Sequence, residues 1–260
     1  MSTIPPSSAA SAPPSPGSLA PPAPKSPTPD SMPPRPVAPV WHTIVLAAFF
    51  LGLAAAGAVF QRAATLHPGV AQRPPQVLPL YISLIVGEWG LVLYVWRGGL
   101  RRRGTALRDV IGGRWGSARD VVRDVAVAVG LWGGAMLLLA GLDRLLGAGH
   151  AASISGFLPR GVLESGLWLL LSLSAGFCEE LVYRGYFMRQ FAAWTRSAWI
   201  GLVLQAVLFG VSHGYQGVTA CVRIAAYGAL FGLVALWRRS LRPGMIAHAL
   251  TDILGGIFRI

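Results

Sequence analysis

The sequence contains few charged residues and few cysteines for its length. Only 12% of the 260 residues are Asp, Glu, Lys or Arg, about half the share of a typical soluble globular domain. The two cysteines, Cys178 and Cys221, both lie in apolar segments, which excludes a disulfide framework and a four-cysteine metal site. The chain also lacks an HExxH sequence, the helical spacing that binds zinc in many hydrolases. These absences argue against a soluble, disulfide-bonded or HExxH-type protein.

Hydrophobic residues are abundant instead, at 53% of the chain, and they gather in long runs. The runs lie at residues 40–60, 77–96, 124–142, 161–187, 198–213, 218–237 and 241–258. Most approach the roughly 20 residues that a helix needs to cross a bilayer. The sequence therefore predicts an all-α fold, a polytopic membrane helix bundle with about seven transmembrane helices.

The first 39 residues differ from the rest of the chain. They hold 14 of the 20 prolines, interleaved with Ser and Ala, and almost no large apolar side chains. Such a segment cannot bury enough surface to offset the entropy lost on ordering. We therefore expect a disordered Pro/Ser/Ala-rich tail over residues 1–39, which lacks the pattern of a signal peptide, and a transmembrane helical domain over residues 40–260.

The formal net charge of +12 comes from arginines in short segments between the runs. A nucleic-acid-binding face would gather them on one surface, so no nucleic-acid partner is expected. The segment between the second and third runs holds Arg97, Arg101, Arg102, Arg103, Arg108, Arg114, Arg119 and Arg123. The segment between the first and second runs holds only Arg62 and Arg73. Because basic loops stay inside, the arginine-rich segment, the N-terminal tail and the loops near residues 189–196 and 238–242 should all be cytoplasmic.

Ionisable residues within the apolar runs are the candidate functional residues, because charges are costly to place in hydrocarbon. The fourth run carries Glu179, Glu180 and Arg184. On a helix Glu180 lies one turn from Arg184, whereas Glu179 points about 100° away. Glu179 is therefore the candidate general base, with Glu180 and Arg184 as a supporting pair. The alternative is an ion pair that only joins two helices.

Two later runs carry histidines. His213 follows Phe209 by one helical turn, so that the aromatic ring would restrict the imidazole; the alternative is a structural histidine bonded to a carbonyl group. His248 and Asp252 share a helix face, and such a pair can orient an imidazole or bind a ligand. Glu88, in the second run, is expected to make a helix contact or to line a cavity.

The order EExxxR, FxxxH and HxxxD resembles the CAAX prenyl protease and bacteriocin-processing family of intramembrane proteases, which includes the type II CAAX and Abi-like proteases. The resemblance covers about residues 165–256, and the first two motifs match the family pattern at every defined position. It implies a helical membrane endopeptidase in which Glu179 and His213 activate a water molecule. It further implies that His248 and Asp252 stabilise the oxyanion and that the supporting residues are Glu180, Arg184 and Phe209.

Asp252 departs from the pattern of the prenyl proteases, which usually carry Asn at this position. Because an ionised Asp cannot donate a hydrogen bond to an oxyanion, three interpretations are open. Asp252 is protonated, or it orients His248, or the site binds a metal. A zinc-like divalent ion would be held by Glu179, His213, His248 and Asp252, whose side chains are ligand types that zinc accepts. A glutamate-activated water without a metal is the favoured alternative.

The resemblance implies a peptide or protein substrate at the bilayer, in CAAX-type or bacteriocin or immunity processing, and a location in the bacterial plasma membrane. The rival hypothesis is a non-catalytic scaffold or immunity protein, or a proton or solute pathway, that uses the same polar cluster. A transporter would be expected to show paired halves, and the sequence shows no duplication.

Simple alternation of the spans creates a mismatch in depth. It places Glu179 and His248 toward the cytoplasmic half, but His213 roughly 20 Å into its span at 1.5 Å per residue. The three residues can meet only if the fourth helix is long, tilted or broken, or if the fifth begins later than expected. Glycines in the runs, including Gly133, Gly134, Gly228 and Gly232, are expected to permit close helix packing.

Overall fold

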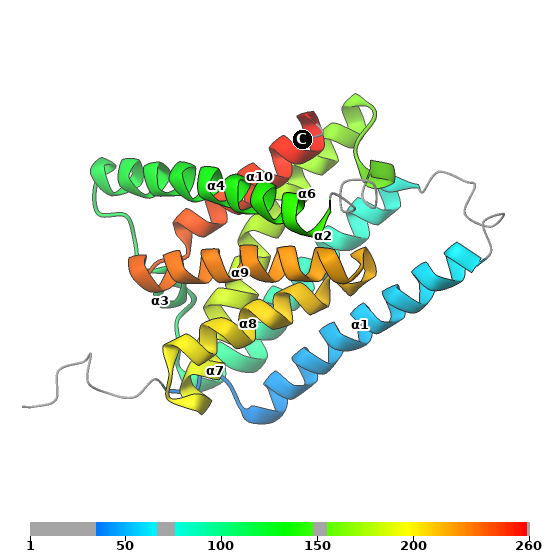
Figure 1. Ribbon diagram of the computed structural model, residues 1–260. Coiled ribbons are helices and arrows are strands. Elements are labelled where there is room, and N and C mark those ends of the chain that lie inside the picture. Colours follow the sequence, from blue (N-terminus) through cyan, green and yellow to red (C-terminus); the bar gives the residue numbers. More distant parts are fainter. Residues whose placement is uncertain (1–34, 67–75, 148–154, 259–260) are drawn as a thin grey trace, which may run out of the picture. The chain divides into compact units, whose positions relative to one another are not determined.

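The computed structural model describes residues 35–66, 76–147 and 155–258, and every regular element in these residues is helical. The α-helices are α1 (Val40–Leu66), α2 (Val77–Tyr94), α3 (Leu107–Ile111), α4 (Ala118–Leu146), α6 (Val162–Glu180), α7 (Met188–Thr195), α8 (Ala198–Ser212), α9 (Val218–Arg238) and α10 (Arg242–Phe258). Two π-helical segments, η2 (Val95–Gly99) and η5 (Leu181–Phe187), continue α2 and α6. Three 3₁₀ turns complete the elements: η3 (Leu100–Arg103), η4 (Ser155–Phe157) and η6 (Gly214–Gln216). The predicted all-α class is confirmed (Figure 1).

Five helical segments are long and apolar enough to cross a membrane, by length and composition: Val40–Val59, Val77–Arg103, Ala118–Leu146, Val162–Thr195 and Val218–Arg238. They indicate an integral membrane protein. Each of the seven predicted runs coincides with a helix, but α8 has 15 residues and α10 has 17, fewer than the roughly 20 of a typical span. The total of seven spans therefore stays a prediction. Of the predicted tail, residues 1–34 lie outside the described residues.

The fourth run forms a longer helix than the sequence pattern predicts. α6, η5 and α7 continue one another over 34 residues, Val162–Thr195, so the helix ends eight residues beyond the predicted boundary at residue 187. Glu179 then lies 16 residues before Thr195, and His213 lies 15 residues after Ala198. Because α7 and α8 meet at the short turn between these ends, both side chains lie about 22–24 Å along their helices from the turn. The long fourth helix thus removes the mismatch in depth.

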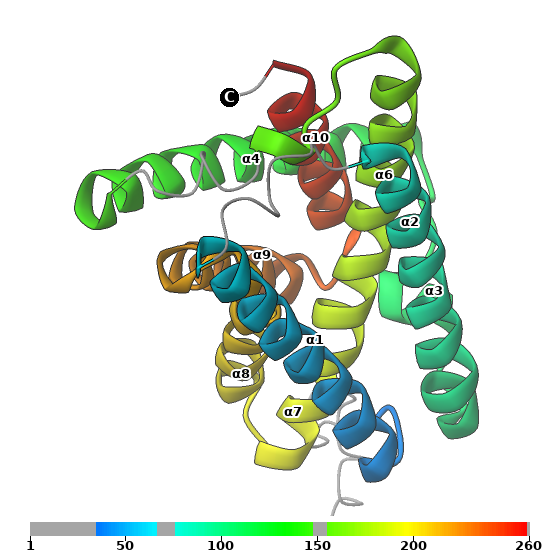
Figure 2. The ribbon, with the colours of Figure 1, turned by 90° about the vertical axis from the view of Figure 1, so that its right-hand side faces the viewer.

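α10 packs antiparallel to α6, and glycines bring the two backbones close together (Figure 2). A Cβ atom added at Gly176 would lie 2.8 Å from both the Met245 oxygen and the Ala249 nitrogen. One at Gly244 would lie 2.9 Å from Glu180 Oε2. Small residues of this kind allow the close backbone approach that drives helix association in membranes. They bring the α10 histidine beside the α6 glutamates.

α8 and α9 form a second close pair, which packs beside α7 (Figure 1). Added Cβ atoms at Gly228 and Gly232 would lie 2.9 Å from Phe209 and Gln205 side-chain atoms, so the predicted close packing at these glycines is confirmed. The same prediction is wrong for Gly133 and Gly134. An added Cβ at either would meet nothing within 4 Å in the described part of the chain, because the faces of α4 that carry them are open.

The segments predicted to be cytoplasmic meet at one end of the bundle. Arg189, near the end of the long fourth helix, donates to the carbonyl groups of Asp109 and Val110 in α3 at 3.3 and 3.0 Å. The Leu241 amide donates to the Ile111 carbonyl at 2.9 Å. Gln190 Oε1 accepts hydrogen bonds from the amides just before α1. The shared position of these segments agrees with the topology inferred from the arginines.

We expect Gly176→Ala to destabilise the protein by about 1–3 kcal/mol, because the added methyl group would overlap backbone atoms of α10. Gly133→Ala is the matched control and should be neutral or slightly stabilising, since its methyl group meets open space. Unfolding of the purified protein in detergent measures both. Equal stabilities of the two variants would contradict the close α6–α10 contact.

Candidate active site

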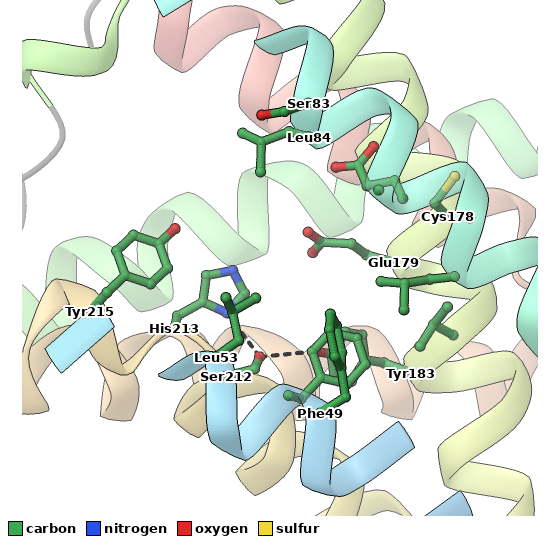
Figure 3. Close-up of a pocket in the computed structure, with 16 residues that line it drawn as sticks. Phe49, Leu53, Ser83, Leu84, Cys178, Glu179, Tyr183, Ser212, His213 and Tyr215 are labelled. Atoms are coloured by element: carbon green, nitrogen blue, oxygen red, sulfur yellow. Dashed lines mark hydrogen bonds between the residues drawn. The ribbon is translucent and has the colours of Figure 1, made fainter. Parts of the chain in front are cut away.

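A pocket of about 420 Å³ is lined by residues of α1, α2, the α6–η5 segment, the end of α8 and η6. α2 packs against α6, and α1 packs against α8 and η6. The pocket lining consists of Phe49, Phe50, Leu53, Ser83, Leu84, Gly87, Glu88, Gly90, Leu91, Cys178, Glu179, Val182, Tyr183, Ser212, His213 and Tyr215. Figure 3 shows the Glu179 carboxylate and the His213 ring directed toward the same space. The predicted base and the first predicted histidine therefore share one cavity.

Glu180 is buried beside the pocket and contacts two cationic or potentially cationic groups. Its Oε1 atom lies 3.0 Å from Arg184 NH1 and 3.1 Å from His248 Nδ1. The side chains of Glu180 and Arg184 are almost fully buried. The predicted i,i+4 pair thus exists, and it also receives a hydrogen bond from α10. Because a carboxylate only accepts, Nδ1 of His248 carries the donated hydrogen.

Aromatic rings and a carbonyl group surround Arg184 in this buried position. Its guanidinium carbon lies 4.4 Å from the centre of the Phe209 ring and 5.7 Å from that of Phe231. Its NH2 group donates to the Gly228 carbonyl at 3.3 Å. Cation–π contacts strengthen when water is excluded, so the two rings and the Glu180 carboxylate together accommodate a charge that hydrocarbon would not.

The second nitrogen of His248 faces two carboxylates. Nε2 lies 3.7 Å from Glu179 Oε2 and 3.7 Å from Asp252 Oδ2. Both distances exceed a direct hydrogen bond, so these are charge contacts at this separation. The group that hydrogen-bonds His248 directly is Glu180, and not Asp252. His248 and Asp252 are not part of the pocket lining, and they connect to it through Glu179.

His213 lies just beyond α8, where the backbone leaves the helix. Its Nδ1 atom donates to the carbonyl of Phe209 at 2.8 Å, and the Phe209 ring meets the imidazole edge to face at 5.0 Å. The predicted contact between these two residues is present. In a neutral ring this arrangement leaves Nε2 without a hydrogen, available to accept a hydrogen bond.

The sequence analysis missed two polar residues of the pocket, Tyr183 and Ser212. The Tyr183 hydroxyl donates to Ser212 Oγ at 2.9 Å (Figure 3). Ser212 Oγ donates in turn to the Phe209 carbonyl at 2.7 Å. Their signal was their location inside the EExxxR and FxxxH motifs. The helical pattern did not show that they would face each other across two helices.

Glu88 lines the pocket, which is one of the two positions expected for it from the sequence.

The described residues do not form the predicted metal-ligand set. In the described part of the chain, no group of three or more His, Cys, Asp and Glu side chains is arranged to hold a metal ion. His248 donates from Nδ1 to Glu180, and a hydrogen bond of this kind is compatible with metal binding through Nε2. The described geometry thus offers no preformed site for a divalent ion at Glu179, His213, His248 and Asp252, and metal binding there stays a prediction.

A carboxylate and an imidazole that share a cavity with room for water can together polarise and deprotonate a water molecule. A buried imidazole beside that carboxylate can stabilise negative charge that develops during the reaction. The fold and the site therefore define a helical membrane protein with a hydrolase-type pocket between its helices.

Residues 161–254 match the family model of type II CAAX prenyl endopeptidases, described as Rce1-like. By this match, that segment of the chain is similar to this family of endopeptidases. It contains α6 to α9 and most of α10, and all seven site residues predicted from the motifs. Neither the search of curated proteins nor that of solved structures finds a match. The similarity implies a membrane endopeptidase.

We expect Arg184→Leu to destabilise the protein by about 3–5 kcal/mol, because it leaves the Glu180 carboxylate buried without its cation. The double variant Glu180→Gln with Arg184→Leu should recover much of this loss. Arg119→Leu, at an exposed arginine, serves as the control. Thermal unfolding in detergent compares the four proteins. An Arg184→Leu protein as stable as the control would contradict a buried ion pair.

Proposed function

We propose that this protein is an intramembrane endopeptidase that hydrolyses a peptide bond in a membrane-associated protein or peptide, with Glu179 as the general base. One observation carries the proposal. Glu179 lines a pocket together with His213, and its Oε2 atom lies 3.7 Å from Nε2 of His248. Acid, imidazole and space for water thus lie together at mid-helix depth, where lipid alone would exclude water.

In the proposed reaction a water molecule binds between Glu179 and His213. Glu179 takes one proton of the water, and Nε2 of His213 accepts a hydrogen bond from the other. The water oxygen attacks the carbonyl carbon of the substrate, and the carbonyl oxygen becomes an oxyanion. The proton held by Glu179 then moves to the amide nitrogen as the C–N bond breaks, which releases an acid and an amine.

We assign to His248 the stabilisation of the oxyanion, in its protonated form and through Nε2. The contact of its Nδ1 with Glu180 and the nearby carboxylate of Asp252 support a positive ring. In this role the Asp252 carboxylate stabilises the positive charge of His248 and donates no hydrogen bond itself. This role explains why an Asp can stand where the prenyl proteases usually carry Asn. Glu180, Arg184 and Phe209 position the two imidazoles.

We infer that the substrate reaches the site from the membrane and that processing is of the CAAX type or the bacteriocin or immunity type. The apolar pocket wall, with Phe49, Leu53 and Leu84, suits a hydrophobic segment. We further place the protein in the bacterial plasma membrane with its N-terminal tail in the cytoplasm. The contacts of the arginine-rich segment with the α9–α10 turn and with Arg189 support this orientation.

Glu179→Ala and His213→Ala should each lower kcat by about 10²–10⁴-fold, because each removes a group that handles the attacking water. The assay uses purified protein in liposomes with a library of membrane-anchored reporter peptides, and mass spectrometry identifies the products. Glu164→Ala, at a half-buried carboxylate near the start of α6 and outside the pocket lining, is the matched control and should keep full activity. Cleavage that survives Glu179→Ala would exclude this mechanism. A folded wild-type protein that cleaves no peptide would favour the scaffold or solute-pathway hypothesis.

A chelator added to the same assay should leave the rate unchanged, since the described residues do not form a metal-binding group. Loss of cleavage that zinc then restores would instead show that an ion takes part. Thermal unfolding with and without the chelator, run in parallel, separates a catalytic effect from loss of the fold.

A further inference from the structure

Part of the pocket wall comes from α1 and α2, which lie outside the matched residues 161–254. α2 contributes Ser83, Leu84, Gly87, Glu88, Gly90 and Leu91 to the lining. Glu88 is the one carboxylate in this helix. Its side chain is close enough to Glu179, Asp252 and His248 for an electrostatic interaction with each of them. The α2 wall therefore presents an acidic side chain to the reaction space, in a position that the proposed reaction does not use.

Most other polar side chains of the pocket are already hydrogen-bonded within the protein. Ser83 Oγ donates to the Leu80 carbonyl at 2.8 Å. Tyr183 and Ser212 bond to each other, and His213 Nδ1 bonds to Phe209. Glu88 differs, because no hydrogen bond joins it to any other described residue and its Oε2 atom is buried without a partner. A buried acceptor without a partner is costly, so its presence in a pocket indicates a ligand.

Glycines lie on both sides of Glu88 along the wall. Among the described residues, a Cβ atom added at Gly87 or Gly90 would meet nothing within 4 Å, and both glycines line the pocket. No side chain therefore projects from α2 at Gly87 or Gly90, the glycines before and after Glu88. A main chain can approach a helix closely where glycines replace larger residues.

A peptide that enters this pocket must satisfy its backbone N–H groups, because an unpaired N–H in a water-poor membrane site costs several kcal/mol. Glu179 is engaged with the attacking water in the proposed reaction. Oε2 of Glu88, in the α2 part of the wall, is a buried carboxyl oxygen without a partner in the described residues. A carboxyl group accepts hydrogen bonds from backbone amides.

We propose that Glu88 is a substrate-positioning residue that accepts a hydrogen bond from a backbone N–H of the bound peptide, with Gly87 and Gly90 providing the close approach. This inference rests on the proposed endopeptidase function and extends it. The α2 wall holds the peptide, and the α6 and α8 residues act on its carbonyl group. Binding through a main-chain N–H is compatible with many side chains at that position of the substrate.

The test measures KM and kcat separately, with the reporter peptide that the wild-type protein cleaves best in liposomes. Glu88→Ala should raise KM about tenfold with kcat nearly unchanged, because the lost contact holds the substrate before and during the reaction alike. Glu88→Gln should restore most of the affinity, since the amide oxygen also accepts. Val86→Ala is the matched control on the same helix and should change neither constant, because this side chain is exposed and does not line the pocket.

A second measurement changes the backbone of the substrate. Reporter peptides in which one backbone N–H at a time is replaced by an ester oxygen should include one position where KM rises about tenfold with the wild-type protein. With Glu88→Ala, the same ester should add less than twofold, because the partner of the N–H is already absent. Gly87→Leu should raise KM as well, whereas Gly52→Leu on the exposed face of α1 should not.

The outcomes separate the two proposals. If Glu179→Ala abolishes cleavage but Glu88→Ala and every ester leave KM unchanged, the positioning role is wrong and the endopeptidase proposal stands. If Glu88→Gln lowers kcat as strongly as Glu88→Ala, Glu88 transfers a proton and the hydrogen-bonding role is also wrong. If Glu88→Ala does not fold, the ester series and Gly87→Leu still decide.

Discussion

The rest of the site depends on the contact that Glu180 makes with both Arg184 and His248. Its Oε1 atom lies 3.0 Å from the guanidinium and 3.1 Å from the imidazole, so one carboxylate links the fourth helix to α10. The contact fixes which nitrogen of His248 bonds to Glu180 and which one faces Glu179 and Asp252. A charge buried without this partner would destabilise the bundle, and the same pair therefore stabilises the fold and orients the candidate catalytic imidazole.

Close backbone packing makes that contact possible. Gly244 leaves space for the Glu180 carboxylate, and Gly176 lets α10 approach α6. Gly228 supplies the carbonyl that receives Arg184 and lies against the Phe209 ring. Phe209 in turn covers Arg184 with its ring and accepts the His213 hydrogen bond through its carbonyl. A single residue thus joins the buried ion pair to the histidine that lines the pocket.

The pocket combines two parts of the chain with different roles. The family segment supplies Glu179, His213 and the residues that hold them. α1 and α2 supply an apolar wall with Glu88 on it. The pocket therefore depends on how both parts of the chain pack together.

The sequence by itself determined the helical membrane class, the seven apolar segments and the identity of the polar residues within them. Helical periodicity was sufficient for these, because it relates residues that are neighbours on one helix, such as Glu180 with Arg184 and Phe209 with His213. Only the tertiary structure decided the contacts between helices. It placed His248 on Glu180, paired Tyr183 with Ser212, brought Glu88 into the pocket and left Gly133 open. The physical reason is that contacts between helices depend on how far each helix extends and on which faces pack together. The length of the fourth helix exceeds that of its apolar run, and the glycines that allow close packing contact residues far away in the chain. Neither property follows from the periodicity of a single helix.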